Sequence, residues 1–362
     1  MKCLENISRI NYPKELVYNL TLLYTYRGKD FYYEDVFKNH MNGIVRNTII
    51  KDTIYAGKIL GLNVTDARMK YIAKKDSEPK TKEEMVVSNL KKVFTIIQEK
   101  GTDFEITSNE ILKLAELTFR GATQVGYKLD QEDVHTNLLT ETRTKSRRDL
   151  MDEELSLYIK ALDDLHIEVT QIATDLYVDM LNMEYFKKFN EYIALLTLYC
   201  LLFRERFNVF KYVSFFEKYY EKQDQFKSAT AAANYGWKDG YSQTAVLNNM
   251  IIDLMLEGYD FIENQVQSHE FDKNIRKVDS VEGTIMKLDR IFTKDQIKVQ
   301  CPTLSDSTIN RALKKLKDEK KIAPNGTGRS ATWVKLVEDE ILVKGTKGQL
   351  SLFDLLGEEA DD

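Results

Sequence analysis

The side chains that most often carry out catalysis are few and scattered in this sequence. It has four histidines and three cysteines, at His40, His135, His166 and His269 and at Cys3, Cys200 and Cys301. No pair of them has the spacing of zinc ligands, and neither a phosphate-binding glycine loop nor a nucleophile elbow occurs. His166 lies near two aspartates, which would suit acid–base chemistry, but on a polar helical face it is more often a solvated residue. We therefore expect no metal ion and no cofactor.

A basic stretch near the C-terminus suits a different chemistry, the binding of a polyanion. Ile309, Leu313 and Leu316 recur at helical spacing and can pack one face of a helix against a core. The other face can then enter the major groove of DNA with Ser307, Thr308, Asn310, Arg311 and Lys314. The lysines that can reach phosphates are Lys315, Lys317, Lys320 and Lys321. Arg329, in a glycine-rich turn, is placed to enter a minor groove.

The elements around this stretch predict a small α+β domain over 283–337. We expect a first helix over 283–289, a second capped by Thr293, a third over 305–320, and two short strands within 322–336 around a glycine-rich turn. This is the order of a winged helix-turn-helix domain. A merely solvated face, or a winged helix that contacts protein, remains the alternative to DNA binding.

The net charge of −5 conceals a division of the chain. Residues 286–336 carry 12 Lys and Arg against 5 Asp and Glu, whereas residues 337–362 carry 2 against 8. Such asymmetry is typical of a local polyanion-binding surface on an otherwise acidic protein. We therefore expect DNA as a partner of the basic module.

The acidic tail over 338–362 carries a short hydrophobic motif. Its residues are Gln349, Leu350, Leu352 and Phe353, which resemble the peptide by which bacterial replication proteins bind the sliding clamp. A disordered tail suits that mode of binding, in which a hydrophobic pair enters a groove on the partner. A short helix that folds back on the body, with Leu356, is the alternative.

Composition sets the fold class and the compartment. The 362 residues include only 16 Gly and 4 Pro, which disfavours a turn-dense β fold. The distant cysteines disfavour a secreted disulfide scaffold. The longest apolar run, 192–203, is shorter than the ~20 residues that span a bilayer. We expect a mainly helical, cytoplasmic protein that does not contact a membrane; its oligomeric state, including a homodimer, stays open.

Helix signals divide the rest of the chain. Thr81 begins a capping box with Glu84, so a helix should start near Lys82, and Thr107 repeats the signal. Longer helices with apolar faces follow over 150–266. Gly126 to Val134 is short enough for a hairpin. We expect an N-terminal helical region over 1–100 and a helical core over 101–270.

The order of these segments over 40–265 resembles the Fic (Fic/DOC) family. The resemblance rests on Ile106-Thr107, Gly126-Tyr127-Lys128, a helix ending at Asn182-Met183, Phe210-Lys-Tyr-Val-Ser214 and Tyr219-Tyr220. It implies a helical fold and, in members with the loop motif HPFxDGNGRxxR, transfer of AMP from ATP to a hydroxyl side chain. The motif would fall on 184–195, where only Phe186 and Asn190 match.

The replaced positions of that motif are the ones that carry the chemistry. Glu184 stands for the catalytic histidine and Lys188 for the acidic Mg²⁺ ligand. The two motif glycines that cradle phosphate are replaced by Phe189 and Glu191, and the two motif arginines are replaced by Tyr192 and Leu195. The segment nearest to the family's inhibitory motif, 47–52, has lysine at the glutamate position. The resemblance therefore implies a degenerate site.

These patterns together predict a DNA-binding regulatory protein: a catalytically degenerate Fic-like helical core followed by a winged helix. One alternative is a nucleotidyl- or phosphoryl-transferase that uses Glu184 or Lys188 in a rearranged loop. Another is an accessory protein tethered to the sliding clamp by its tail. We expect no enzymatic AMP transfer by the family mechanism.

Overall fold

Threonine side chains begin two helices where the sequence predicted them. The computed structural model describes residues 2–129, 145–164, 167–272, 277–302, 304–326 and 332–336. In it the Thr81 hydroxyl accepts the N–H of Glu84 at 3.1 Å, and α6 spans Lys82–Lys100. Thr107 caps α7, Ser108–Phe119, in the same way. Each hydroxyl satisfies an N–H that the first turn of a helix leaves without a partner.

The predicted capping box at Thr81 is wrong in its second half. The Glu84 carboxylate accepts the N–H of Lys80 at 2.7 Å rather than that of Thr81. It also makes a two-point contact with the Arg68 guanidinium, at 3.0 and 2.7 Å. The charged guanidinium of Arg68 is a stronger hydrogen-bond donor than the backbone N–H of Thr81. The contact with Arg68 therefore overrides the local capping motif.

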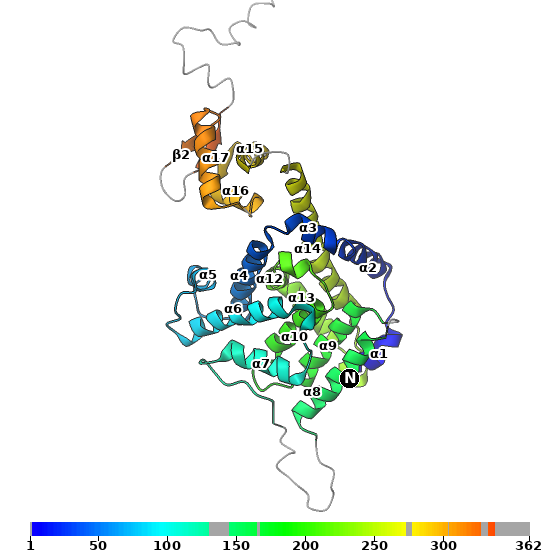
Figure 1. Cartoon of the computed structure of the whole chain (residues 1–362). Helices are drawn as coiled ribbons and strands as arrows, with labels where there is room; N and C mark the ends of the chain where they lie inside the picture. The colour runs from blue at the N-terminus through cyan, green and yellow to red at the C-terminus, as the bar shows by residue number, and fades with distance from the viewer. Residues whose placement is uncertain are drawn as a thin grey trace, which may run out of the picture. The chain divides into compact units, whose positions relative to one another are not determined.

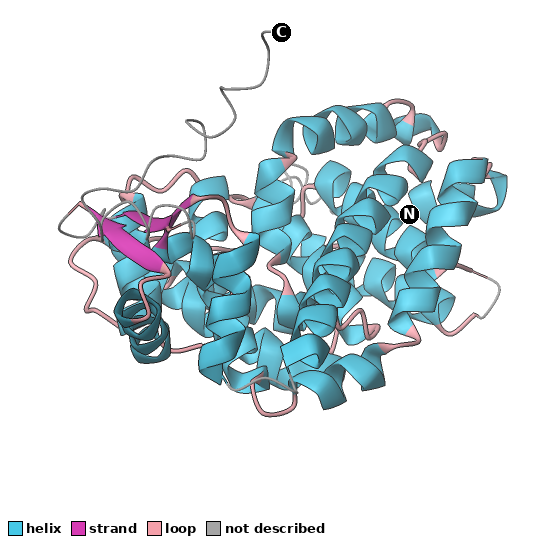
Figure 2. Cartoon of the chain, turned by 90° about the horizontal axis from the view of Figure 1, so that it is seen from above, coloured by secondary structure: helices cyan, strands magenta, loops and turns pink. Residues whose placement is uncertain are grey.

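The described residues fall into two compact units, Met1–Gln265 and Val266–Asp362. The first unit is helical (Figures 1 and 2), and the predicted boundary at residue 100 inside it stays a prediction. Besides α6 and α7 its helices are α1 Lys2–Asn6, α2 Lys14–Arg27, α3 Asp30–Phe37, α4 Met41–Ile59, α5 Asp66–Lys75, α8 Arg147–Leu162, α9 Val169–Met183, α10 Asn190–Arg204, α11 Val209–Tyr212, α12 Phe215–Glu221, α13 Gln223–Asn234 and α14 Ala245–Asp272, the last of which continues into the second unit.

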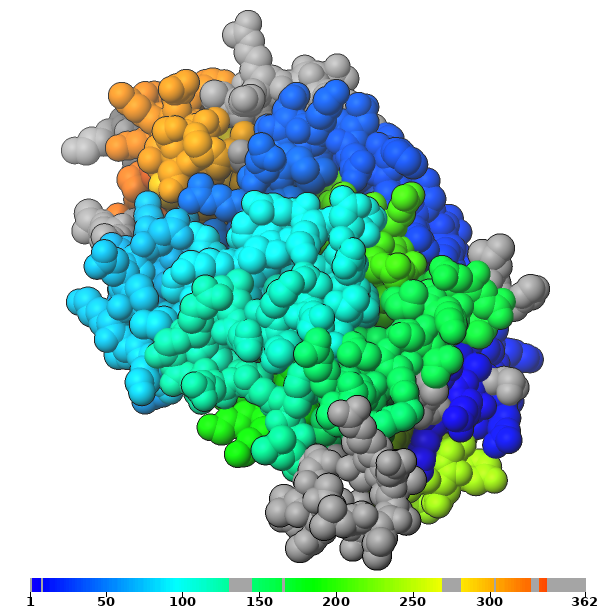
Figure 3. All heavy atoms as spheres, turned by 60° about the horizontal axis from the view of Figure 1, so that its bottom comes forward, coloured from blue at the N-terminus to red at the C-terminus, as the bar shows by residue number. Residues whose placement is uncertain are grey.

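Helices α9 and α10 form the centre of the first unit. Every residue over 170–180 and over 192–203 is buried, so both helices are enclosed on all sides. They pack against each other; α1, α8 and α13 pack on α9, and α7 packs on α10. Figure 3 shows α6 and α7 side by side on one face. The helix predicted to end at Met183 does end there.

Helix α9 carries two aspartates into this core. Asp179 accepts hydrogen bonds from the Trp237 indole at 2.6 Å, the Tyr158 hydroxyl at 2.7 Å and the backbone N–H of Cys3 at 3.2 Å. Asp175 lies one turn earlier, and its Oδ1 accepts hydrogen bonds from the side chains of Gln171 and Thr244. Burial raises the pKa of Asp175 to about 7. The core of this unit is therefore partly polar, and it is held by directed hydrogen bonds.

The second unit combines three helices with a small sheet. Its elements are α15 Lys277–Lys287, β1 Ile291–Thr293, α16 Lys294–Gln300, α17 Asp306–Asp318, β2 Ile322–Asn325 and β3 Thr332–Lys335. The strands are antiparallel in the order β1-β3-β2, with Phe292 opposite Trp333 and Pro324 on the other side of Trp333. This small α+β region completes the mainly α fold that the sequence predicted.

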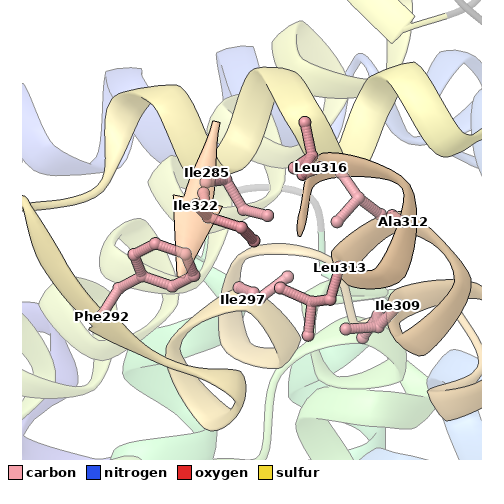
Figure 4. Packing of buried hydrophobic residues seen from close by; sticks show 9 residues of the cluster. Ile285, Phe292, Ile297, Ile309, Ala312, Leu313, Leu316 and Ile322 are labelled. Atoms are coloured by element: carbon pink, nitrogen blue, oxygen red, sulfur yellow. The ribbon is translucent and has the colours of Figure 1, made fainter. Parts of the chain in front are cut away.

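One apolar cluster holds the second unit together (Figure 4). Ile309, Leu313 and Leu316 of α17 pack there, as predicted, against Ile285 and Phe292 among others. The first helix was predicted over 283–289 but spans 277–287, and the strand β1 was not predicted. A three-residue strand has too few alternating positions to be recognised.

No helix in the described part of the chain combines the length and the apolar character that a membrane span requires.

Candidate functional site

Helix α17 presents a polar face opposite its packing stripe. Ser307, Asn310, Arg311 and Lys314 are exposed, whereas Thr308 is half-buried and its hydroxyl lies 2.9 Å from that of Ser305. The exposed residues recur every three or four positions, so they share one side of the helix. Of the predicted DNA-contacting residues on α17, the structure places four on one face, and Thr308 contributes to the start of the helix.

Lys315 differs from these residues because it is tied to neighbouring carboxylates. Its Nζ lies 3.6 Å from Glu282 on α15 and 3.8 Å from Glu319. Lys321 forms an ion pair with the same two carboxylates.

The predicted residues Arg329, Gln349, Leu350, Leu352 and Phe353 lie outside the described residues.

The loop that joins α9 to α10 turns sharply without glycine. Glu184 has a φ of 48° and Phe189 a φ of 61°, in the left-handed region that glycine favours. Asn190 compensates by bridging the two helices. Its side chain accepts the N–H of Phe186 at 3.2 Å and donates to the carbonyl of Met180 at 2.9 Å. Asn190, one of the two motif matches, therefore positions the loop.

The segment 126–128 lies beside this loop as an extended partner. The backbone bonds run from Lys128 N–H to Tyr185 O at 2.8 Å and from Lys187 N–H to Gly126 O at 3.1 Å. The ring of Tyr127 stacks on that of Phe186 at 5.1 Å. The hairpin predicted over 126–134 lies partly outside the described residues, and its described part pairs with the loop instead.

Glu184, the residue at the catalytic position, is engaged by a cation. Its carboxylate is exposed and forms an ion pair with Lys128. The hydrogen bond and the charge of Lys128 hold the pKa of Glu184 below its ordinary value. A carboxylate with a lowered pKa is a weaker general base. Lys188 lies on the surface, with its Nζ 3.5 Å from the Thr123 hydroxyl.

A cleft of about 880 Å³ opens at this loop. The predicted residues Glu184, Phe186, Lys188 and Asn190 all line it. Lining residues that the sequence analysis missed include Lys227, Tyr177 and Tyr219. They come from α9, α12 and α13, and no spacing along the chain could have grouped them. Within the described residues, no cluster of histidine, cysteine and carboxylate side chains could hold a metal ion.

The comparisons with known proteins decide the fold. No protein-family model matches the sequence, and no match was found among curated proteins. Among solved structures, a crystal structure of a Fic family protein from Desulfovibrio desulfuricans G20 matches with a TM-score of 0.53 at 12% identity. The match covers 94% of this chain and 98% of that one. This chain has a Fic-like fold.

The predicted mainly α, Fic-like fold is therefore confirmed. At 12% identity the likeness concerns the fold alone. The chemistry of this chain has to be judged from its own residues. The loop that lines the cleft carries Glu184 at the position of the catalytic histidine and Lys188 at the position of the acidic Mg²⁺ ligand.

Proposed function

We propose that this protein is a DNA-binding regulator, built on a Fic-like fold that no longer transfers AMP. The observation that carries the proposal is the exposed face of α17, with Asn310, Arg311 and Lys314 together on one side. The opposite side is anchored in the apolar cluster of the second unit, so the face is held rigidly. A rigid helix with arginine, lysine and amide side chains suits a major groove, where arginine pairs with guanine and asparagine with adenine.

The topology of the second unit supports a winged helix-turn-helix. Helix, strand, two helices and two strands follow one another, which is the order of elements expected of a winged helix-turn-helix domain. Ser305 caps α17 by accepting the N–H of Thr308 at 3.3 Å, so the recognition helix begins at a defined point after the turn. The excess of Lys and Arg over 286–336 supplies the attraction to phosphates.

A double substitution of Arg311→Ala with Lys314→Ala tests the proposal. We expect it to weaken binding to a labelled 25-base-pair duplex by ten- to a hundredfold, because one base contact and one phosphate contact are lost, about 1–3 kcal/mol for the base contact alone. The salt dependence of log K should flatten by about one or two. Fluorescence anisotropy over a salt series, with random and genomic duplexes, measures both.

The matched control removes the same charge from the first unit. Lys82→Ala with Lys92→Ala neutralises two exposed lysines of α6 and should change duplex affinity less than about twofold, because neither residue is on α17. Binding that ignores salt, or an Arg311/Lys314 variant that binds as the control does, contradicts the proposal.

A nucleotidyl- or phosphoryl-transferase is the second candidate, and the cleft is the observation that favours it. Lys187, Lys188 and Lys227 around a cleft of about 880 Å³ offer positive charge for a phosphate. Against it, Lys128 engages Glu184, whose lowered pKa makes it a weak base. We expect no transfer of label when the protein is incubated with radiolabelled ATP and Mg²⁺. Transfer that disappears in Glu184→Ala would reverse this ranking.

Binding of the tail motif to a sliding clamp remains a proposal from sequence, because residues 349–353 lie outside the described residues.

A further inference from the structure

Several cations of the basic module are already engaged within the second unit. Lys335 donates to the carbonyl of Met286 at 2.9 Å, at the end of α15, and Lys298 lies 2.6 Å from Asp306. Lys315 and Lys321 share the carboxylates of Glu282 and Glu319, as described above. The charge read from the sequence therefore overstates the charge that the surface can offer to a polyanion.

The local backbone explains why Lys321 reaches Glu282. Lys320 adopts a left-handed conformation with φ of 58°, and the N–H of Lys321 returns to the carbonyl of Leu316 at 2.9 Å. This closes the end of α17 and brings Lys321 toward α15. Glu282 is largely covered, with 19% of its side chain exposed, so its ion pairs are less screened than pairs at the surface.

The cations on the central face of α17 are in a different state. Within the described residues, Arg311, Lys314 and Lys317 make no ion pair. Lys315 follows Arg311 by four residues and so lies on the same flank of the helix. If it were released, it would point toward the same duplex as Arg311.

We infer that Glu282, together with Glu319, withholds Lys315 and Lys321 from DNA, so that the cations through which α17 contacts a duplex are Arg311, Lys314 and Lys317. The inference rests on the proposed function and assigns a role within that surface. Each phosphate contact adds affinity for any DNA sequence, because it releases counterions. Holding two lysines back therefore lowers non-specific binding and leaves the base contacts of α17 to dominate.

Glu282→Gln tests this inference in the full-length protein. We expect duplex affinity at low salt to rise about threefold to tenfold and the salt slope to steepen by about one to two, since Lys315 and Lys321 then keep only the more exposed carboxylate of Glu319 as a partner. Asp289→Asn is the matched control: it removes one negative charge from an exposed residue after α15 that holds no described lysine. It should raise affinity less than about twofold.

Lys315→Ala with Lys321→Ala completes the cycle. In the wild-type background it should change affinity less than about twofold, and in the Glu282→Gln background it should remove the whole gain. Trp333 fluorescence and far-UV circular dichroism check that each variant is folded. If the lysine variant weakens wild-type binding as much as Lys314→Ala does, or if Glu282→Gln behaves like Asp289→Asn, the inference is wrong. If no variant and no wild-type protein binds any duplex, the proposed function itself fails.

Discussion

We expect Tyr199→Ala to lower the free energy of unfolding of the first unit by about 3–5 kcal/mol, the range for removing a large aromatic side chain from a core. Tyr199 is fully buried on α10. Five aromatic rings surround it, with centroids 5.4–6.1 Å away: Phe94, Phe203, Phe210, Phe215 and Phe216. Alanine leaves a cavity between α6, α10 and α12, and all five neighbours lose contacts.

The conservative variant Tyr199→Phe separates packing from hydrogen bonding. The Tyr199 hydroxyl accepts a hydrogen bond from Gln98 Nε2 at 3.1 Å, and the same nitrogen donates to the carbonyl of Phe210 at 2.9 Å. Because Gln98 keeps its hydrogen bond to the carbonyl of Phe210, the free energy of unfolding should fall by only about 1 kcal/mol.

Denaturation in guanidinium chloride measures both variants. The chain has two tryptophans, Trp237 in the first unit and Trp333 in the second, so a Trp333→Phe background makes fluorescence report the first unit alone. Equal losses for the alanine and phenylalanine variants would contradict the role assigned to the ring.

We expect the free energy of unfolding of the first unit to fall as the pH rises from about 5 to about 9, by an amount on the order of several kcal/mol. Burial raises the pKa of Asp52 and of Asp175 to about 7, and burial, followed by the charge of Asp179, raises that of Glu154 to about 8. The ordinary values are 3.8 for aspartate and 4.5 for glutamate.

The sign follows from where the protons are held. Between the ordinary and the raised values the folded chain keeps protons that the unfolded chain has released. The stabilisation is complete below the ordinary values and disappears as the pH passes the raised ones. Unfolding by guanidinium chloride at pH 5, 7 and 9 measures the slope. A free energy that is flat or rises over this range would contradict the prediction.

Glu154→Gln identifies the contribution of one group. The amide resembles the protonated acid and cannot ionise, so we expect the variant to be more stable than wild type at pH 9 and to lose less stability between pH 5 and pH 9. Glu153→Gln is the matched control, because Glu153 is exposed and pairs with Lys145. It should leave the pH dependence unchanged.

Several helices of this protein could be predicted from local signals. Thr81, Thr107 and Ser305 begin helices through hydrogen bonds that reach only three residues along the chain, so the sequence alone contains them. The packing stripe of α17 is likewise a matter of helical period. The sequence also shows which side chains occupy 184–190, but it does not show which residues they contact.

Contacts between distant residues were decided by the tertiary structure. Lys128 and Glu184 lie 56 residues apart, and no period along the chain relates them. The pairing of Lys321 with Glu282 spans 39 residues in the same way. Asp175 and Asp179 are ordinary polar positions in the sequence, and only the enclosure of α9 on all sides raises the pKa of Asp175. Local patterns in the sequence predict several helices and the charges that those helices carry. The fold determined which of those charges are buried, paired or left exposed, because burial and ion pairing depend on distances that only the packed chain defines.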